Sequence, residues 1–206
     1  MQNIPPVTRN LLIVNVIMFI ATLINPVFMK GTFSMAFPLS TEFRWWQPLT
    51  HMFMHDGFFH IFFNMYSLFL FGSVLERTIG SKKFVVFYFL SGIGSMLLHL
   101  LTIYFWASPE VRIFTPMLGA SGAIYGLFIG YGMLYPDSVL TLVFPPVSLK
   151  AKWMMAIFVG IELLIGVLDT ADGVAHFAHL GGALLGFVMI LYWKKSGKIW
   201  LRDKWI

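Results

Sequence analysis

The chain has 206 residues, of which 58% are hydrophobic and only 11% are charged, and it contains no cysteine. Because soluble domains carry about 25% charged residues, this composition excludes an ordinary soluble protein and indicates several membrane passes; the lack of cysteine excludes disulfides, thiolate metal sites and a cysteine nucleophile. The net charge of +5 lies in short loops and in the tail rather than on one basic face, so we expect no nucleic-acid partner.

Six apolar runs predict membrane-spanning helices, since a helix needs about 20 apolar residues to cross the hydrocarbon core. The expected helices cover residues 11–28, 58–74, 84–106, 119–135, 152–168 and 173–193. The first run lacks the small-residue cleavage pattern of a signal peptide, so we interpret it as a retained anchor. The fourth run is short and stops at Pro136. We therefore predict one all-α membrane domain over residues 1–206.

The segment between the first two runs, about residues 29–57, is long and aromatic, as in "FRWWQPLTHMFMH". Aromatic side chains favour the membrane–water interface. We expect this first loop to lie in or beside the outer leaflet, partly embedded, with short helical pieces.

Basic residues indicate the orientation of the six helices. The loops on one side of the predicted bundle contain only Lys30, Arg44 and Arg112. The basic clusters all fall on the opposite side, together with the two ends of the chain: they are Arg9, Arg77, Lys82, Lys83, Lys150, Lys152, Lys194, Lys195, Lys198, Arg202 and Lys204. Since basic loops remain in the cytoplasm, we predict that both termini are cytoplasmic.

Polar groups recur at one depth of the predicted bundle. His60 and Asn64 lie in the outer part of the second helix, and Ser121 opens the fourth. His179 lies about six residues into the sixth helix, or about 9 Å below its outer end. A lone serine commonly bonds to its own helix, and a lone histidine commonly bonds to a neighbouring helix. The shared depth favours a reactive site instead.

The residue types at this depth suit acyl transfer. Ser121 becomes a nucleophile if His179 takes its proton, and Tyr125, one turn later, can stack on the imidazole. Glycines at four-residue spacing would let the fourth and sixth helices touch. They are Gly122, Gly126 and Gly130 on the fourth helix and Gly182 and Gly186 on the sixth.

Two further donors can stabilise the oxyanion. His60 and Asn64 share one face of the second helix, and the unpaired backbone N–H groups at the start of the fourth helix can join them. We expect no buried acid to orient His179, because Asp169 and Asp172 belong to the outer loop before the sixth helix. We therefore predict a Ser-His dyad rather than a triad.

With these residues, the chain resembles the rhomboid family of intramembrane serine proteases over nearly its whole length. The resemblance rests on "HDGFFHIFFNM", "LGASGAIYG" and "AHLGGALLG", in that order on the second, fourth and sixth helices, and on "GSVLERTIGSKKF" where the second helix ends. It implies a six-helix rhomboid-like bundle of the compact prokaryotic form, and hence a prokaryotic plasma-membrane protein. It also implies a site that faces the extracytoplasmic side and uses no metal or other cofactor.

The family pattern assigns roles residue by residue. It implies Ser121 as nucleophile and His179 as base, with His60 and Asn64 at the oxyanion. The supporting residues that it implies are Gly119, Gly122, Tyr125, Gly182, Gly186 and a structural Glu76. The implied reaction is hydrolysis of a peptide bond in or near the transmembrane segment of another membrane protein, in a polar cavity open to the outside. This sequence has Gln47 where many members carry a loop-anchoring arginine, so the resemblance leaves that part of the loop's hydrogen bonding undetermined.

Three alternatives stay open. A metal enzyme could use His51, His55 and His60, but carboxylates are sparse, and we expect His51 and His55 to anchor the first loop and line the cavity. A catalytically silent binder or chaperone of membrane helices would have lost the serine or the histidine, and both are present here. Glu162, within the fifth helix, is interpreted either as an interhelical hydrogen-bond partner or as part of a gate between the second and fifth helices. The substrate's identity and the oligomeric state stay open.

Overall fold

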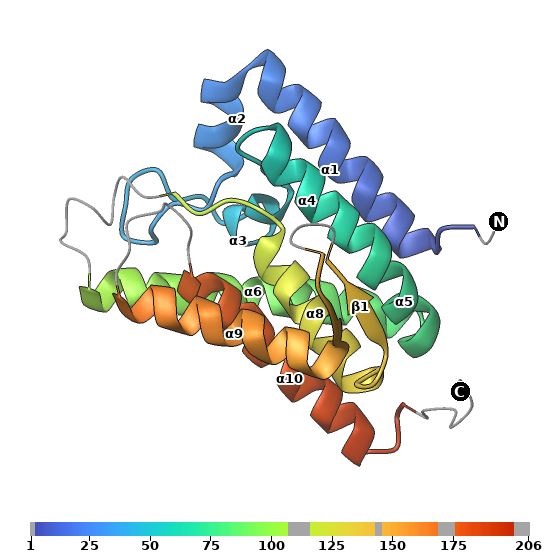
Figure 1. Cartoon of the computed structure of the whole chain (residues 1–206). Coiled ribbons are helices and arrows are strands. Elements are labelled where there is room, and N and C mark those ends of the chain that lie inside the picture. Colours follow the sequence, from blue (N-terminus) through green and yellow to red (C-terminus); the bar gives the residue numbers. More distant parts are fainter. Residues whose placement is uncertain (1–2, 107–115, 143–145, 169–175, 200–206) are drawn as a thin grey trace.

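The computed structural model describes residues 3–106, 116–142, 146–168 and 176–199 (Figure 1). Within this part of the chain, five helices are long and apolar enough to cross a membrane, and α8 (Ser121–Leu134) is a shorter apolar helix. The predicted class, an all-α membrane bundle, is confirmed. Helix α1 begins and helix α10 ends on the same side of the bundle (Figure 1).

The first predicted helix, residues 11–28, is displaced and interrupted. Helix α1 covers Pro6–Ile24, and a second helix, α2, covers Pro26–Phe33. Pro26 has no N–H to continue the helix, but it is well suited to begin one. Asn25 caps the new helix by accepting a hydrogen bond from the Phe28 N–H at 3.2 Å. The prediction named the Asn25–Pro26 region as the end of the first helix, but its range continued to residue 28.

The second predicted helix is longer than residues 58–74. It consists of α4 (Phe58–Ser67), a π-helical turn η2 (Leu68–Gly72) and α5 (Ser73–Ile79). The helix ends at Gly80, whose φ of 83° suits glycine. The charged residues at 76 and 77 misled the prediction, because Glu76 is buried against the start of α1 rather than facing solvent.

The remaining helices are α6 (Ser81–Trp106), α9 (Ala151–Leu168) and α10 (His176–Lys195). Residues 173–175, where the sixth helix was expected to start, lie outside the described residues, as do Asp169, Asp172 and Arg112. A short antiparallel hairpin of β1 (Val139–Thr141) and β2 (Ser148–Lys150) lies between α8 and α9 and was not predicted.

The first loop folds into short pieces that pack against α1, α2 and α6. It contains α3 (Gln47–Thr50) and the 3₁₀ turn η1 (His51–Phe53). The loop reaches the start of α8 through two backbone links, an isolated bridge between Met35 and Met117 and a hydrogen bond from the Gly119 N–H to the His51 carbonyl. The loop therefore fixes the turn that precedes Ser121.

Gln47 supplies the hydrogen bonding that the sequence left undetermined at this position of the first loop. Its side chain is fully buried. The Oε1 atom accepts from the backbone N–H groups of Ala36 and Arg44 at 3.2 and 3.1 Å, and Nε2 donates to the carbonyl of Glu42 at 3.1 Å. The amide both donates and accepts, which a guanidinium cannot do. The loop is therefore hydrogen-bonded at this position, by an amide in place of a guanidinium.

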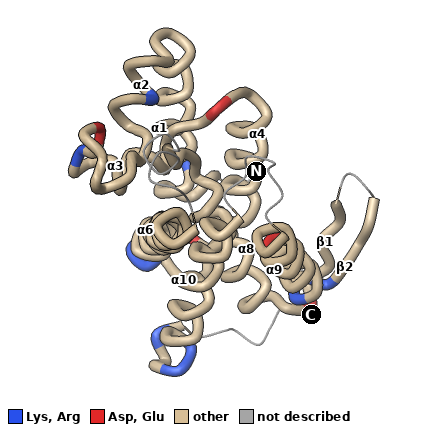
Figure 2. The backbone as a smooth tube through the Cα atoms, turned by 90° about the vertical axis from the view of Figure 1, so that its left-hand side faces the viewer, with Lys and Arg blue, Asp and Glu red and all other residues tan. Residues whose placement is uncertain are grey.

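Helices α6, α8 and α10 form the centre of the bundle, with α9 packed against α8 and α10 and with α1 packed against α2 and α4. Seen from the side of α2 and α3, α6 and α9 lie on opposite flanks of the α8–α10 pair (Figure 2). Many Lys and Arg residues gather near the start of α6, the end of α10 and β2 (Figure 2). The buried apolar core joins η2, α5, α6, α8 and α10, together with Leu11 of α1 and Met52 of η1.

Glycines bring α8 and α10 into backbone contact. A Cβ atom on Gly182 would lie 1.9 Å from the carbonyl oxygen of Gly122, and one on Gly186 would lie 2.8 Å from the Cα of Gly126. No side chain fits at such distances, so the two helices approach as closely as their backbones allow. This contact sets the distance between the residues near the starts of α8 and α10.

Candidate active site

Ser121 is the first residue of α8 and follows an irregular turn. Gly119 in this turn has a φ of 119°, which L side chains rarely adopt. A Cβ atom on Gly119 would also lie 2.8 Å from Nε2 of His60. Glycine at this position therefore serves both the turn and the close approach of the imidazole. Ser121 and His60 are half-buried.

Ser121 and His179 are in hydrogen-bonding contact. The Oγ of Ser121 lies 3.0 Å from Nε2 of His179. The His179 ring is buried and stacked on Tyr125, with ring centroids 4.3 Å apart and an interplanar angle of 9°. This stacking holds the imidazole with one nitrogen toward the hydroxyl. The structure thus brings together three residues that are up to 58 positions apart in sequence.

The side chains of α4 complete this end of the site. The Nδ1 of His60 accepts a hydrogen bond from the backbone N–H of Asp56 at 3.3 Å, so the ring proton resides on Nε2, the atom beside Gly119. Asn64 is buried and donates one amide hydrogen to the His60 carbonyl at 3.0 Å. His60 therefore presents an N–H donor toward the start of α8.

His55 lies beside the site, whereas Glu76 lies far from it. His55 is buried with its ring edge-on to that of His60, at a centroid distance of 5.0 Å. Glu76 lies at the far end of its span and accepts hydrogen bonds from the Val7 and Thr8 N–H groups, the Thr8 hydroxyl and the Ser81 hydroxyl at 2.7–3.0 Å. It joins α1, α5 and α6 and takes no part in the Ser121 contact.

The expectation that no acid reaches His179 was wrong. Glu162 of α9 is buried, and its Oε1 lies 3.0 Å from Nδ1 of His179. Its Oε2 lies 2.8 Å from Nδ1 of His176, and Oε1 also accepts the hydroxyl proton of Tyr125. The ring N–H of His179 is poorly aligned with Oε1, so this contact has ion-pair distance without the direction of a straight hydrogen bond.

The sequence carried a signal for Glu162 that was not used. Helix α9 runs opposite to α10, and Glu162 lies six residues before Leu168. That position is about 9 Å from the helix end at 1.5 Å per residue, the depth expected for His179. Counting depth on every helix would have placed the carboxylate at the level of the imidazole.

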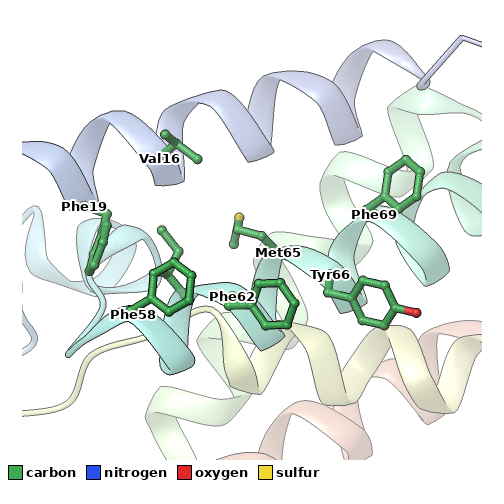
Figure 3. Close-up of a pocket in the computed structure, with 8 residues that line it drawn as sticks. Val16, Phe19, Phe58, Phe62, Met65, Tyr66 and Phe69 are labelled. Carbon is green, nitrogen blue, oxygen red and sulfur yellow. The ribbon is translucent and has the colours of Figure 1, made fainter. Parts of the chain in front are cut away.

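A hollow of about 430 Å³ lies between α1 and α4, away from Ser121 and His179. Figure 3 shows its lining, which includes Val16 and Phe19 from α1 and Phe58, Phe62 and Met65 from α4. These side chains are apolar, so this hollow is not the polar cavity expected at the site. That cavity stays a prediction.

Among the described residues, the histidines considered as metal ligands do not form a metal-binding cluster. Across residues 3–106, 116–142, 146–168 and 176–199, no group of three or more His, Asp or Glu side chains has a geometry that could hold a metal ion. His51 and His55 are instead buried within the first loop, and His51 Nδ1 bonds to the Gln47 carbonyl at 3.0 Å.

Fold and geometry define a multi-span helical membrane protein with a serine–imidazole contact. Residues 42–196 match the family model described as the Rhomboid domain, and the chain belongs to the rhomboid family.

Three relatives illustrate the similarity. RHOMBOID-like protein 5 of Arabidopsis thaliana is 31% identical over 71% of this chain and 44% of its own length. Rhomboid protease AarA of Providencia stuartii is 29% identical over 73% and 56%, and Rhomboid-like protease 3 of Toxoplasma gondii is 33% identical over 77% and 56%. The matching region thus spans about half of the length of these relatives.

Proposed function

We propose that this chain is an intramembrane serine endopeptidase, which hydrolyses peptide bonds in or near the transmembrane segments of other membrane proteins. The observation that carries the proposal is the 3.0 Å contact between Ser121 Oγ and His179 Nε2 beneath the stacked ring of Tyr125. It is supported by family membership and by relatives that bear the name protease.

In the first half of the reaction, His179 Nε2 takes the proton of Ser121, and Oγ attacks the carbonyl carbon of the scissile bond. The carbonyl oxygen becomes an oxyanion. His60 Nε2–H, the second amide hydrogen of Asn64 and the backbone N–H groups at the start of α8 stabilise it. His179 then gives its proton to the leaving nitrogen, the C–N bond breaks, and an acyl-serine ester remains.

In the second half, water replaces the departed amine. His179 takes a proton from the water, the hydroxide attacks the ester, and the same donors stabilise the second oxyanion. The Ser121 C–O bond breaks and His179 returns the proton to Oγ, which regenerates the site. No cofactor enters this sequence of steps.

The substrate and the orientation belong to the same proposal. Because the reacting serine opens a short apolar helix inside the bundle, the substrate is a transmembrane segment that unwinds locally to expose its carbonyl. Both termini lie in the cytoplasm, and the site faces the extracytoplasmic side of a prokaryotic plasma membrane. The basic residues near the starts of α6 and α9 and the end of α10 support this orientation.

Covalent labelling with a fluorophosphonate probe tests the reaction class. We expect purified protein to be labelled at Ser121, and both Ser121→Ala and His179→Ala to abolish labelling and cleavage of a transmembrane substrate. Ser73→Ala, which removes a buried serine from α5, serves as the matched control and should label normally. Cleavage that persists in Ser121→Ala would refute the proposal. A protein that binds membrane helices but never reacts with the probe would be the silent binder.

A further inference from the structure

We propose that Glu162 is a positioning acid for His179, so that the site works as a Ser121–His179–Glu162 relay in which the carboxylate comes from α9. The inference rests on the function proposed above and deepens it. The observation that carries it is the 3.0 Å separation of Glu162 Oε1 from His179 Nδ1, on the side of the ring opposite to Ser121.

The contact determines which imidazole nitrogen carries the proton. A carboxylate only accepts, so its position at Nδ1 favours the tautomer with hydrogen on Nδ1. Nε2 then keeps the lone pair that receives the Ser121 proton. When Nε2 becomes protonated, the negative charge of Glu162 stabilises the resulting imidazolium, as the acid does in a Ser-His-Asp triad.

The surroundings hold the carboxylate in this position. Tyr125 of α8 donates its hydroxyl to Oε1 while its ring supports His179, and His176 of α10 donates Nδ1–H to Oε2 at 2.8 Å. Donors from two other helices thus satisfy a buried carboxylate on α9, which would otherwise be costly to bury in its charged form.

The burial pattern of α9 shows that this polar contact is unusual there. Only Ala151, Met154, Met155 and Glu162 of α9 are buried, and the first three lie near the start of the helix. In the outer half of the helix, Ile161, Leu163 and Leu164 are exposed on the bundle surface. Glu162 therefore joins the outer half of α9 to the site, and the reactivity of His179 depends on that helix being docked.

The decisive variant is Glu162→Gln, which keeps the shape but removes the charge. We expect kcat to fall by about 10- to 1,000-fold with KM little changed, because the amide stabilises the imidazolium poorly and can donate to Nδ1. The loss should be smaller than the roughly 10,000-fold effect of the same change in a Ser-His-Asp triad, since the Nδ1–H is poorly aligned with Oε1 here.

The pH–rate profile separates positioning from folding. Glu162→Gln removes the negative charge beside the reacting pair, so the acid limb of kcat should move in this variant. Among the described residues, four other titratable side chains face this pair: His60 of α4, His99 of α6, Tyr125 of α8 and His176 of α10. They are unchanged in the variant, so a shift of the limb reports the loss of Glu162.

Glu76→Gln is the matched control, because it neutralises a buried, fully bonded carboxylate away from Ser121. It should lower Tm and leave the acid limb in place. Glu162→Asp, which keeps the charge on a shorter side chain, should restore the acid limb while kcat stays below wild type. If Glu162→Gln does not fold, the kcat and acid limb of Glu162→Asp provide the test. A wild-type kcat in Glu162→Asp would overturn the inference.

The outcomes distinguish this inference from the proposed function. If Ser121→Ala abolishes cleavage but Glu162→Gln keeps wild-type kcat and an unmoved acid limb, the positioning role is wrong and the function stands. If Glu162→Gln loses Tm and activity together without a moved limb, as a purely structural residue would, the role is also wrong. If Ser121→Ala still cleaves, the function itself fails and the relay fails with it.

Discussion

His51 and His55, in the first loop, are buried histidines without full hydrogen bonding. Within the part of the chain that the structure describes, Nε2 of His51 and both ring nitrogens of His55 have no hydrogen-bond partner. Burial lowers the pKa of His51 to about 4, and burial together with the charge of nearby His60 lowers the pKa of His55 to about 3. Both rings are therefore neutral in the folded protein near neutral pH, and they pack as polar members of the core beneath the site.

These values predict loss of stability in mild acid. The unfolded chain binds protons at both histidines below about pH 6.5, whereas the folded chain does not, so stability is full above that pH and falls as the pH drops toward 4. At about pH 5 each histidine should lower the free energy of unfolding by about 2 kcal/mol. Thermal unfolding in detergent at about pH 7.5 and about pH 5 measures the effect.

A variant isolates one of the two histidines. His51→Gln keeps a donor for the Gln47 carbonyl but cannot take up a proton. Its Tm should therefore change less between the two pH values than that of the wild type. An equal change in both proteins would mean that His51 titrates normally in the folded state.

At the scale of elements, the contact between α8 and α10 was predictable because it depends on local composition. Glycine at every fourth position leaves a smooth stripe on each helix, and the spacing can be counted along the chain. The same chain contains a helical glycine that makes no such contact, because a Cβ atom on Gly160 of α9 would meet nothing within 4 Å. The two situations allow a direct comparison.

We expect Gly182→Ala to destabilise the protein by about 3 kcal/mol or more, because the new methyl group would lie 1.9 Å from the Gly122 carbonyl oxygen and must push the helices apart. Gly160→Ala, with the same change in helix propensity, should be neutral or stabilising by up to about 1 kcal/mol. Tm values of the two variants give the measurement. A neutral Gly182→Ala would show that α8 and α10 do not pack through this face.

At the same scale, helix boundaries were the weakest part of the prediction. Hydropathy continued past Asn25, but Pro26 lacks the N–H that would carry the helix on, so α1 ends there and α2 begins. Conversely, charge at Glu76 suggested a helix end, yet backbone and hydroxyl donors satisfy the carboxylate inside the protein. A hydropathy window detects neither a missing donor nor a distant partner.

At the scale of the whole molecule, the proposed orientation can be tested cleanly because the chain contains no cysteine. Thr41, between α2 and α3, and Ser196, just after α10, are both exposed. In intact cells, a membrane-impermeant maleimide should label Thr41→Cys at once and label Ser196→Cys only after permeabilisation. The opposite pattern would place the site on the cytoplasmic side.

The sequence by itself determined the membrane class, the number of apolar runs, the glycine stripes and the common depth of Ser121 and His179, because each of these follows from local composition or from position along one helix. The tertiary structure decided how the first loop packs against the helices, how Gln47 hydrogen-bonds within that loop and which acid approaches His179. Those features depend on groups that meet only when separate helices pack. The Glu162 carboxylate of α9 contacts the His179 imidazole of α10 and the Tyr125 hydroxyl of α8. The residue spacing within any one of these helices does not specify that contact.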